Sequence, residues 1–110
     1  MPTTYKVLGR KASAATTMEE LYAVPSSTSA VVSTITVCNR STSARTYRIA
    51  IKPATGTTLA DEHYIAYDVA IAANDTTALT LGVTLATTDV VTVYASSATM
   101  SFSAFGSELS

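Results

Sequence analysis

The chain has 110 residues and a mass of 11.4 kDa, which is the size of one ordinary domain and leaves no room for a second. Its net charge of −1 argues against a nucleic-acid-binding protein, because such proteins carry a large excess of Lys and Arg. Thr, Ala and Ser supply 51 residues, whereas only 14% of the chain is charged. We therefore expect a surface rich in hydroxyl and methyl groups, and a net charge near zero favours association.

Alternation of polar and apolar residues dominates the chain and predicts strands. It is clearest in Arg45–Lys52, where Tyr47, Ile49 and Ile51 share one face. Short strands at intervals of about ten residues indicate an all-β fold, an antiparallel β-sandwich or a jelly-roll-like domain. Eight strands are predicted: Thr4–Gly9, Glu20–Val24, Ala30–Cys38, Arg45–Lys52, His63–Val69, Thr76–Leu81, Asp89–Ala95 and Thr99–Phe105.

One domain is expected over residues 1–110, with residues 1–20 either part of it or an extended arm. A helix over Ala12–Leu21 stays open as an alternative, because Thr17 and the two following glutamates resemble a helix start. The polar segment Asn39–Ala44 is rich in turn-forming residues and predicts a hairpin between its flanking strands.

The predicted core contains the apolar residues that alternation places on one face of each strand. These are Leu21, Val31, Ile35, Val37, Tyr47, Ile49, Ile51, Ile65, Tyr67, Leu79, Leu81, Val91, Val93, Met100 and Phe102.

The charges are unevenly distributed between the two halves of the chain. Residues 1–55 have a net charge of +5, and residues 56–110 have a net charge of −6 with no Lys or Arg. The halves can pair across strands within one sheet, or a basic patch can meet an acidic patch on another subunit. The candidates for a subunit interface are Arg40, Arg45, Arg48, Lys52, Asp61, Glu62, Asp68 and Asp75.

Residues suited to catalysis or metal binding are scarce. Cys38 and His63 are each the only residue of their type, so no intrachain disulfide can form and a zinc site lacks ligands. Cys38 is more simply a small core residue, and the acids have no calcium-loop spacing. We therefore expect no enzyme activity, no cofactor and no metal. We also expect no membrane helix, because the uncharged spans are interrupted by Pro25 or alternate with polar residues.

Two ligand classes require aromatic side chains. Tyr47 lies within the basic group but alternates to the opposite face, so no aromatic platform supports nucleic-acid binding. A carbohydrate-binding adhesion module remains an alternative, although the chain contains no Trp. Its candidate stacking groups are Tyr5, Tyr22, Tyr64 and Tyr94.

Four segments carry a family resemblance: Leu21–Pro25 (LYAVP), Ser33–Arg40 (STITVCNR), His63–Asp68 (HYIAYD) and Ser101–Glu108 (SFSAFGSE). With these segments the chain resembles small virion structural proteins of tailed bacteriophages over nearly its whole length. The sequence departs from that pattern at Thr87-Thr88-Asp89, where relatives place glycine before the acid.

The resemblance implies a non-enzymatic, multimeric β-sandwich protein of the virion. We expect a capsid cement or decoration protein, with a tail, neck, baseplate or fibre subunit as the alternative. Its expected partners are other virion structural proteins and further copies of the chain, a trimer being the favoured form, with no nucleic acid and no membrane. The opening segment lacks the unbroken apolar core of a secretory signal, so we expect synthesis in the host cytoplasm without export.

Overall fold

The computed structural model describes residues 3–110 and contains eight strands and one short 3-10 helix, η1 (Asp61–His63). The strands are β1 (Thr3–Ala12), β2 (Glu19–Ala23), β3 (Ser29–Asn39), β4 (Arg45–Lys52), β5 (Tyr64–Ile71), β6 (Thr76–Leu85), β7 (Val90–Ala95) and β8 (Met100–Leu109). All eight predicted strands are confirmed. The alternative helix over Ala12–Leu21 is wrong, because β1 ends at Ala12 and β2 begins at Glu19.

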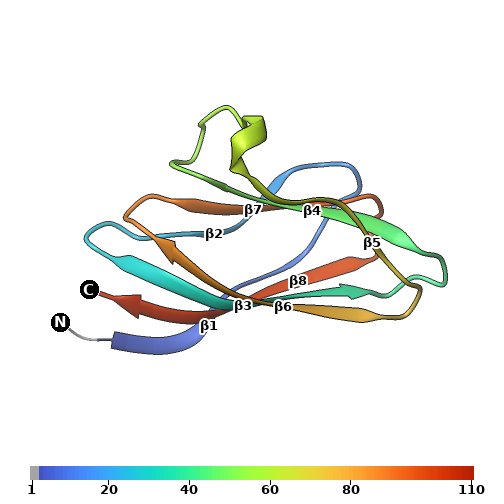
Figure 1. Ribbon diagram of the computed structural model, residues 1–110, viewed down its shortest axis with the longest axis horizontal. Coiled ribbons are helices and arrows are strands. Elements are labelled where there is room, and N and C mark those ends of the chain that lie inside the picture. The colour runs from blue at the N-terminus through green and yellow to red at the C-terminus, as the bar shows by residue number, and fades with distance from the viewer. Residues whose placement is uncertain (1–2) are drawn as a thin grey trace.

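The strands form two four-stranded antiparallel sheets that pack face to face (Figure 1). Sheet A has the order β1-β8-β3-β6, and sheet B has the order β2-β7-β4-β5. Within sheet A, β1 pairs with β8 and β3 with β6, and within sheet B, β2 pairs with β7 and β4 with β5. The chain is therefore one long antiparallel ribbon rolled up around its middle, which is the jelly-roll form of the β-sandwich.

The predicted hairpin between β3 and β4 is wrong, because these strands belong to different sheets. The segment after Asn39 crosses between the sheets, and the buried Asn39 side chain fixes its path. Its Nδ2 group donates to the carbonyl oxygens of Ser43 (2.9 Å) and Ala72 (3.1 Å), and its Oδ1 accepts from the backbone N–H of Ser41 (3.0 Å). Turn-forming residues showed that the chain reverses, but not that it changes sheets while doing so.

Residues 3–12 form an edge strand of the sandwich and not an arm. β1 pairs with β8 from Thr3 opposite Leu109 to Ala12 opposite Ser101. Residues 1–2 lie outside the described residues. The two ends of the roll therefore lie side by side, as Figure 1 also shows.

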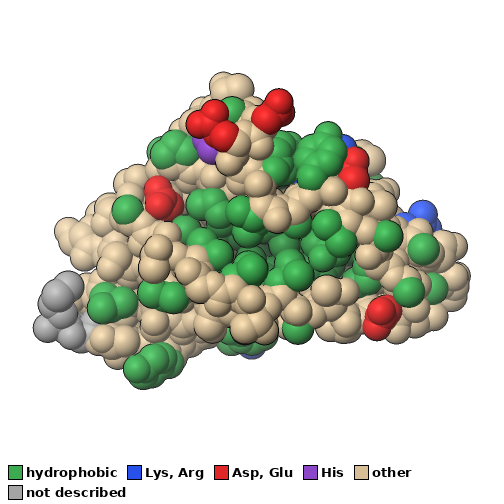
Figure 2. All heavy atoms as spheres, viewed as in Figure 1, with side chains coloured by type: hydrophobic (Ala, Val, Ile, Leu, Met, Phe, Trp, Pro, Cys, Tyr) green, Lys and Arg blue, Asp and Glu red, His purple; other side chains and the backbone are tan. Residues whose placement is uncertain are grey.

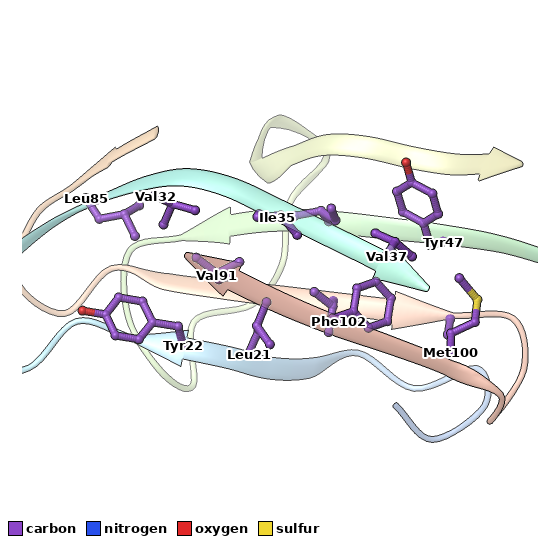
Figure 3. Packing of buried hydrophobic residues seen from close by; sticks show 14 of the residues in the cluster. Leu21, Tyr22, Val32, Ile35, Val37, Tyr47, Leu85, Val91, Met100 and Phe102 are labelled. Carbon is purple, nitrogen blue, oxygen red and sulfur yellow. The ribbon is translucent and has the colours of Figure 1, made fainter. Parts of the chain in front are cut away.

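The core lies between the sheets, and side chains from both sheets point into it (Figure 3). The rings of Tyr47 in sheet B and Phe102 in sheet A meet edge to face, with centroids 6.5 Å apart. Burial of each large side chain contributes about 1.5–3 kcal/mol, so these contacts hold the sheets together. The predicted core residues confirmed as buried are Leu21, Ile35, Val37, Tyr47, Ile49, Val91, Val93, Met100 and Phe102.

Other parts of the predicted core are wrong. Ile65 and Tyr67 of β5 are 48% and 57% exposed, because two register shifts against β4 interrupt the alternation of β5. Val31 is only half-buried, and its neighbour Val32 is fully buried instead. Ile51, Leu79 and Leu81 face the core but are partly buried. Buried residues outside the predicted core include Tyr22, Val24, Ile71, Leu85 and Val90.

The exchange of the predicted buried position, from Val31 to Val32, occurs beside a line of bulges across sheet A. Register shifts occur between Val7 and Gly9 in β1 and between Val32 and Thr34 in β3, the latter against both β8 and β6. An added residue turns the following side chains to the other face and bends the strand. The whole sheet therefore bends along one line.

The outer face of sheet B is partly covered. The segment from Pro53 through η1 lies over this face (Figure 1), and Thr88 Oγ1 donates to the carbonyl of Pro53 at 3.0 Å. Val91 is fully buried and Thr92 is only 3% exposed. They occupy neighbouring positions of β7 and therefore point to opposite faces of sheet B. The central strand β7 is thus enclosed on both sides.

Candidate functional site: an aromatic cluster and a free sheet edge

Among the predicted interface residues, the structure brings Arg48 and Asp68 together. Arg48 Nε donates to Asp68 Oδ1 at 2.6 Å, and Nη2 donates to Oδ2 at 3.3 Å. The guanidinium lies over the rings of Tyr67 (4.2 Å) and Tyr94 (4.4 Å). The hydrogen bond to Asp68 raises the pKa of Arg48 above its ordinary value. This aromatic cluster joins β4, β5 and β7 on the surface of sheet B.

The other basic candidates bind neutral groups. Arg40 donates to Ser101 Oγ (3.0 Å), and Arg45 donates to Ser41 Oγ (3.3 Å). Lys52 Nζ donates to the carbonyl of Thr57 at 3.4 Å. Within residues 3–110 none of these three bases has a carboxylate within ion-pair distance.

The acidic candidates other than Asp68 lie at loops. Asp61 and Glu62 are exposed on η1. Asp75 accepts a hydrogen bond from the backbone N–H of Thr76 at the start of β6. The asymmetry between the halves is therefore only partly neutralised within the chain, by Arg48–Asp68 and by Lys6–Glu108.

The second of these pairs belongs to a cluster that sequence reasoning missed. Lys6 Nζ lies 2.9 Å from Glu108 Oε1, and Tyr22 Oη donates to Glu108 Oε2 at 2.5 Å. The hydrogen bonds from Tyr22 and Lys6 hold the pKa of Glu108 below its usual range. Burial, with the bond to Glu108, raises the pKa of Tyr22. Since Tyr22 lies in sheet B and the other two in sheet A, the cluster ties the sheets together.

Cys38 and His63 are not brought together as a pair. Cys38 lies in β3 of sheet A, and His63 ends η1, before sheet B's edge strand β5. His63 Nδ1 accepts a hydrogen bond from the backbone N–H of Ala60 at 3.0 Å, which closes the 3-10 turn. Its ring therefore has a local structural role.

Residues 3–110 contain no pocket and no group of three or more His, Cys, Asp and Glu side chains suited to a metal ion. No helix in this range is long and apolar enough to cross a membrane.

Strand β6 forms a free edge of sheet A, since it pairs only with β3. Its ten residues, TTALTLGVTL, include no charged residue and no proline. Thr76, Ala78, Thr80, Gly82 and Thr84 are exposed. Thr77, Leu79, Leu81 and Val83 are half-buried, and the last three pack against the core. β6 is thus a sheet edge with backbone groups available for pairing.

Apolar side chains are also exposed on the other sheet. Ile65, Tyr67 and Val69 of β5 are 48%, 57% and 38% exposed. Figure 2 shows hydrophobic side chains gathered in a shallow hollow between the two sheets, on the side where β5 and β6 face the viewer in Figure 1. Exposed apolar surface of this kind marks interaction sites.

Comparison of the chain with protein-family models, with curated proteins and with solved structures finds no match. The fold defines the chain as a jelly-roll β-sandwich.

Proposed function

We propose that the chain is a non-enzymatic structural subunit of a tailed-bacteriophage virion, acting as a capsid decoration or cement protein. The observation that carries this proposal is the uncharged free edge β6 beside the exposed apolar side chains of β5. An isolated protein gains nothing from such an edge, which is prone to aggregation. A subunit that is covered by other coat components uses it as a binding surface.

The fold is compatible with this role. Jelly rolls recur in viral capsid proteins, although a fold alone does not define a function. The four segments that resemble virion proteins lie in or next to β2, β3, β5 and β8, so the resemblance involves both sheets.

Co-sedimentation with virion parts tests the proposal. Heads that lack the chain, and tails, are prepared from the phage that encodes it, and each is mixed with purified chain. Saturable binding to heads, with a higher temperature of head disruption, is the expected result. Saturable binding to tails alone would move the chain to the tail, neck, baseplate or fibre. Absence of binding to both would overturn the virion role.

The aromatic cluster supports a second candidate, a glycan-binding adhesion module. Tyr67 is 57% exposed, and Arg48 and Tyr64 hold its ring, the Tyr64 centroid lying 4.9 Å away. Of the predicted stacking residues, Tyr22 is buried and cannot contribute. A glycan array tests this candidate by comparing Tyr67→Ala with Tyr5→Ala, since Tyr5 is a predicted stacking residue outside the aromatic cluster and is 84% exposed on β1. Binding that is lost only in Tyr67→Ala supports it, and no binding by the unmodified chain excludes it.

A further inference from the structure

The four edge strands differ in how they are protected against pairing. Charged side chains on an edge oppose the addition of another strand. Such residues occur on β1, β2 and β5, whereas β6 has none. β5 is further distorted by its register shifts and by Asp68, whose φ is 50°. The protecting residues are Lys6, Arg10 and Lys11 on β1, Glu19 and Glu20 on β2, and Asp68 on β5.

The side chains of β6 suit a strand that is paired on both sides. Its outward residues are Thr, Ala and Gly, which leave room for a neighbouring strand, and its inward Leu79, Leu81 and Val83 are only half-buried. The register shift against β3 near Leu81 does not interrupt the alternation of exposed and half-buried positions along β6. A strand added at this edge would therefore cover apolar surface on the inner face.

We propose that two copies of the chain pair antiparallel along β6, with Thr80 on the two-fold axis, so that two copies of sheet A become one eight-stranded sheet. In this register Thr80 faces its own copy and Thr76 faces Thr84, while Leu79 faces Leu81 on the inner side. Thr–Thr and aliphatic cross-strand pairs are favourable. Because β6 contains no charged residue, pairing it with β6 of a second copy places no like charges opposite each other.

The ends of the molecule favour the antiparallel direction. At the start of β6, Asn74 N–H donates to the Ser41 carbonyl, and Ser41 Oγ accepts from Arg45. At the end of β6, the N–H of Ala86 donates to Asp89 Oδ2 at 2.9 Å. The first end carries Arg40 and Asp75 in its loops and Arg45 at the start of β4. The second end carries Asp61 and Glu62 on η1, Asp89 before β7 and one base, Lys52, at the end of β4, so it is net acidic. Antiparallel pairing places the net basic end of one copy beside the acidic end of the other.

This charge arrangement is why a second copy is the occupant, and not an unrelated strand. The bases Arg40 and Arg45 and the acids Asp61, Glu62 and Asp89 have no ion-pair partner within residues 3–110. One molecule therefore supplies both sides of a complementary contact, and the two-fold axis forms that contact twice. The arrangement favours a dimer over the trimer expected from the sequence.

Sedimentation velocity from about 1 µM to about 500 µM tests the proposal. The unmodified chain should show a reversible equilibrium between one and two copies. Thr80→Lys places two ammonium groups opposite each other on the axis and should weaken dimerisation at least about tenfold. Thr3→Lys, which adds the same charge to the exposed edge strand β1, is the control and should dimerise normally. A monomer throughout, a trimer, or equal effects of both substitutions would overturn the proposal.

Disulfide cross-linking tests the direction of pairing and needs no charged substitution. In a Cys38→Ser background, Thr80→Cys should oxidise rapidly to a covalent dimer, because directly opposite Cα atoms lie about 4.5–5.5 Å apart. Thr84→Cys should remain monomeric, because its copies would be about 27 Å apart. Rapid linking at position 84, or equal rates at both positions, would overturn the antiparallel register.

The inference stands apart from the virion role, and the experiments separate them. Binding of the unmodified chain to heads or tails measures the virion role, and sedimentation of the same chain alone measures self-pairing. A chain that dimerises but binds neither heads nor tails retains the inference and loses the proposed function. A chain that binds heads but never dimerises retains the proposed function and overturns the inference.

Discussion

Thr88 has a backbone conformation that is costly for its residue type. Its φ is 75°, in the left-handed region that favours glycine, and a β-branched side chain there is strained by about 1–3 kcal/mol. Glycine, which the expected resemblance to virion proteins implies at this position, would be free of that strain. The Thr88 Oγ1 bond to the carbonyl of Pro53 at 3.0 Å offsets part of the strain.

Thr88→Gly should therefore raise the free energy of unfolding by about 0.5–1 kcal/mol, because relief of strain exceeds the loss of one exposed hydrogen bond and the added freedom of the unfolded chain. Chemical denaturation measures the change. Thr87→Gly is the control: it removes a hydrogen bond to the Thr28 carbonyl without relieving strain, since Thr87 has no positive φ. It should be destabilising, and a destabilised Thr88→Gly would contradict the strain argument.

Glu108 should make stability depend on pH. Its pKa is lowered in the folded state by Tyr22 and Lys6, so its contribution is present above the unfolded-state pKa of about 4.3 and is lost as pH falls through the lower folded value. Glu108→Gln should cost about 1–3 kcal/mol at pH 7 and almost nothing near pH 2. Denaturation at the two pH values measures this. Glu62→Gln, on the exposed η1, should change little at either pH, and a pH-independent cost at Glu108 would refute the linkage.

At the scale of elements, the bulge line of sheet A depends on a close backbone contact. A Cβ added at Gly106 would overlap the carbonyl oxygen of Val31, whereas one added at Gly82 would meet nothing. Gly106→Ala should therefore destabilise the protein by about 2–3 kcal/mol because the backbone must shift. Gly82→Ala should be nearly neutral. Thermal melts compare the two, and equal effects would show that backbone freedom, not contact, determines the cost.

The strands could be predicted from the sequence because alternation is a local property. The errors lie where that property fails. Alternation in the sequence places Ile65 and Tyr67 on the core face, but the bulges of β5 turn both side chains outward. A bulge depends on the partner strand, so no pattern within β5 predicts it. In sheet A the strand glycines Gly9, Gly82 and Gly106, in β1, β6 and β8, were local signals of the bulges.

The candidate site could be predicted only in part. Arg48 and Asp68 were both candidates, but not as each other's partners. Tyr22 and Glu108 are 86 residues apart, and their contact depends on how the ribbon rolls. No spacing in the sequence encodes that distance, so the cluster that joins the sheets became visible only in the structure.

At the scale of the whole molecule, both sheets share one core and should unfold together. Phe102 of sheet A contacts Tyr47 of sheet B, and Phe102→Ala should cost about 3–5 kcal/mol. Circular dichroism and tyrosine fluorescence should report coincident transitions for the unmodified chain and for the variant. Separate transitions would show that the sheets are independent units.

The pairing of the first described strand with the last has a practical consequence. Thr3 lies opposite Leu109, so any polypeptide fused before or after the roll departs from the same corner. A short linker across that corner should close the chain into a circle, and new ends can then be opened in the exposed loop at Thr55. By the same geometry, another protein can carry this whole unit as an insertion within one of its surface loops.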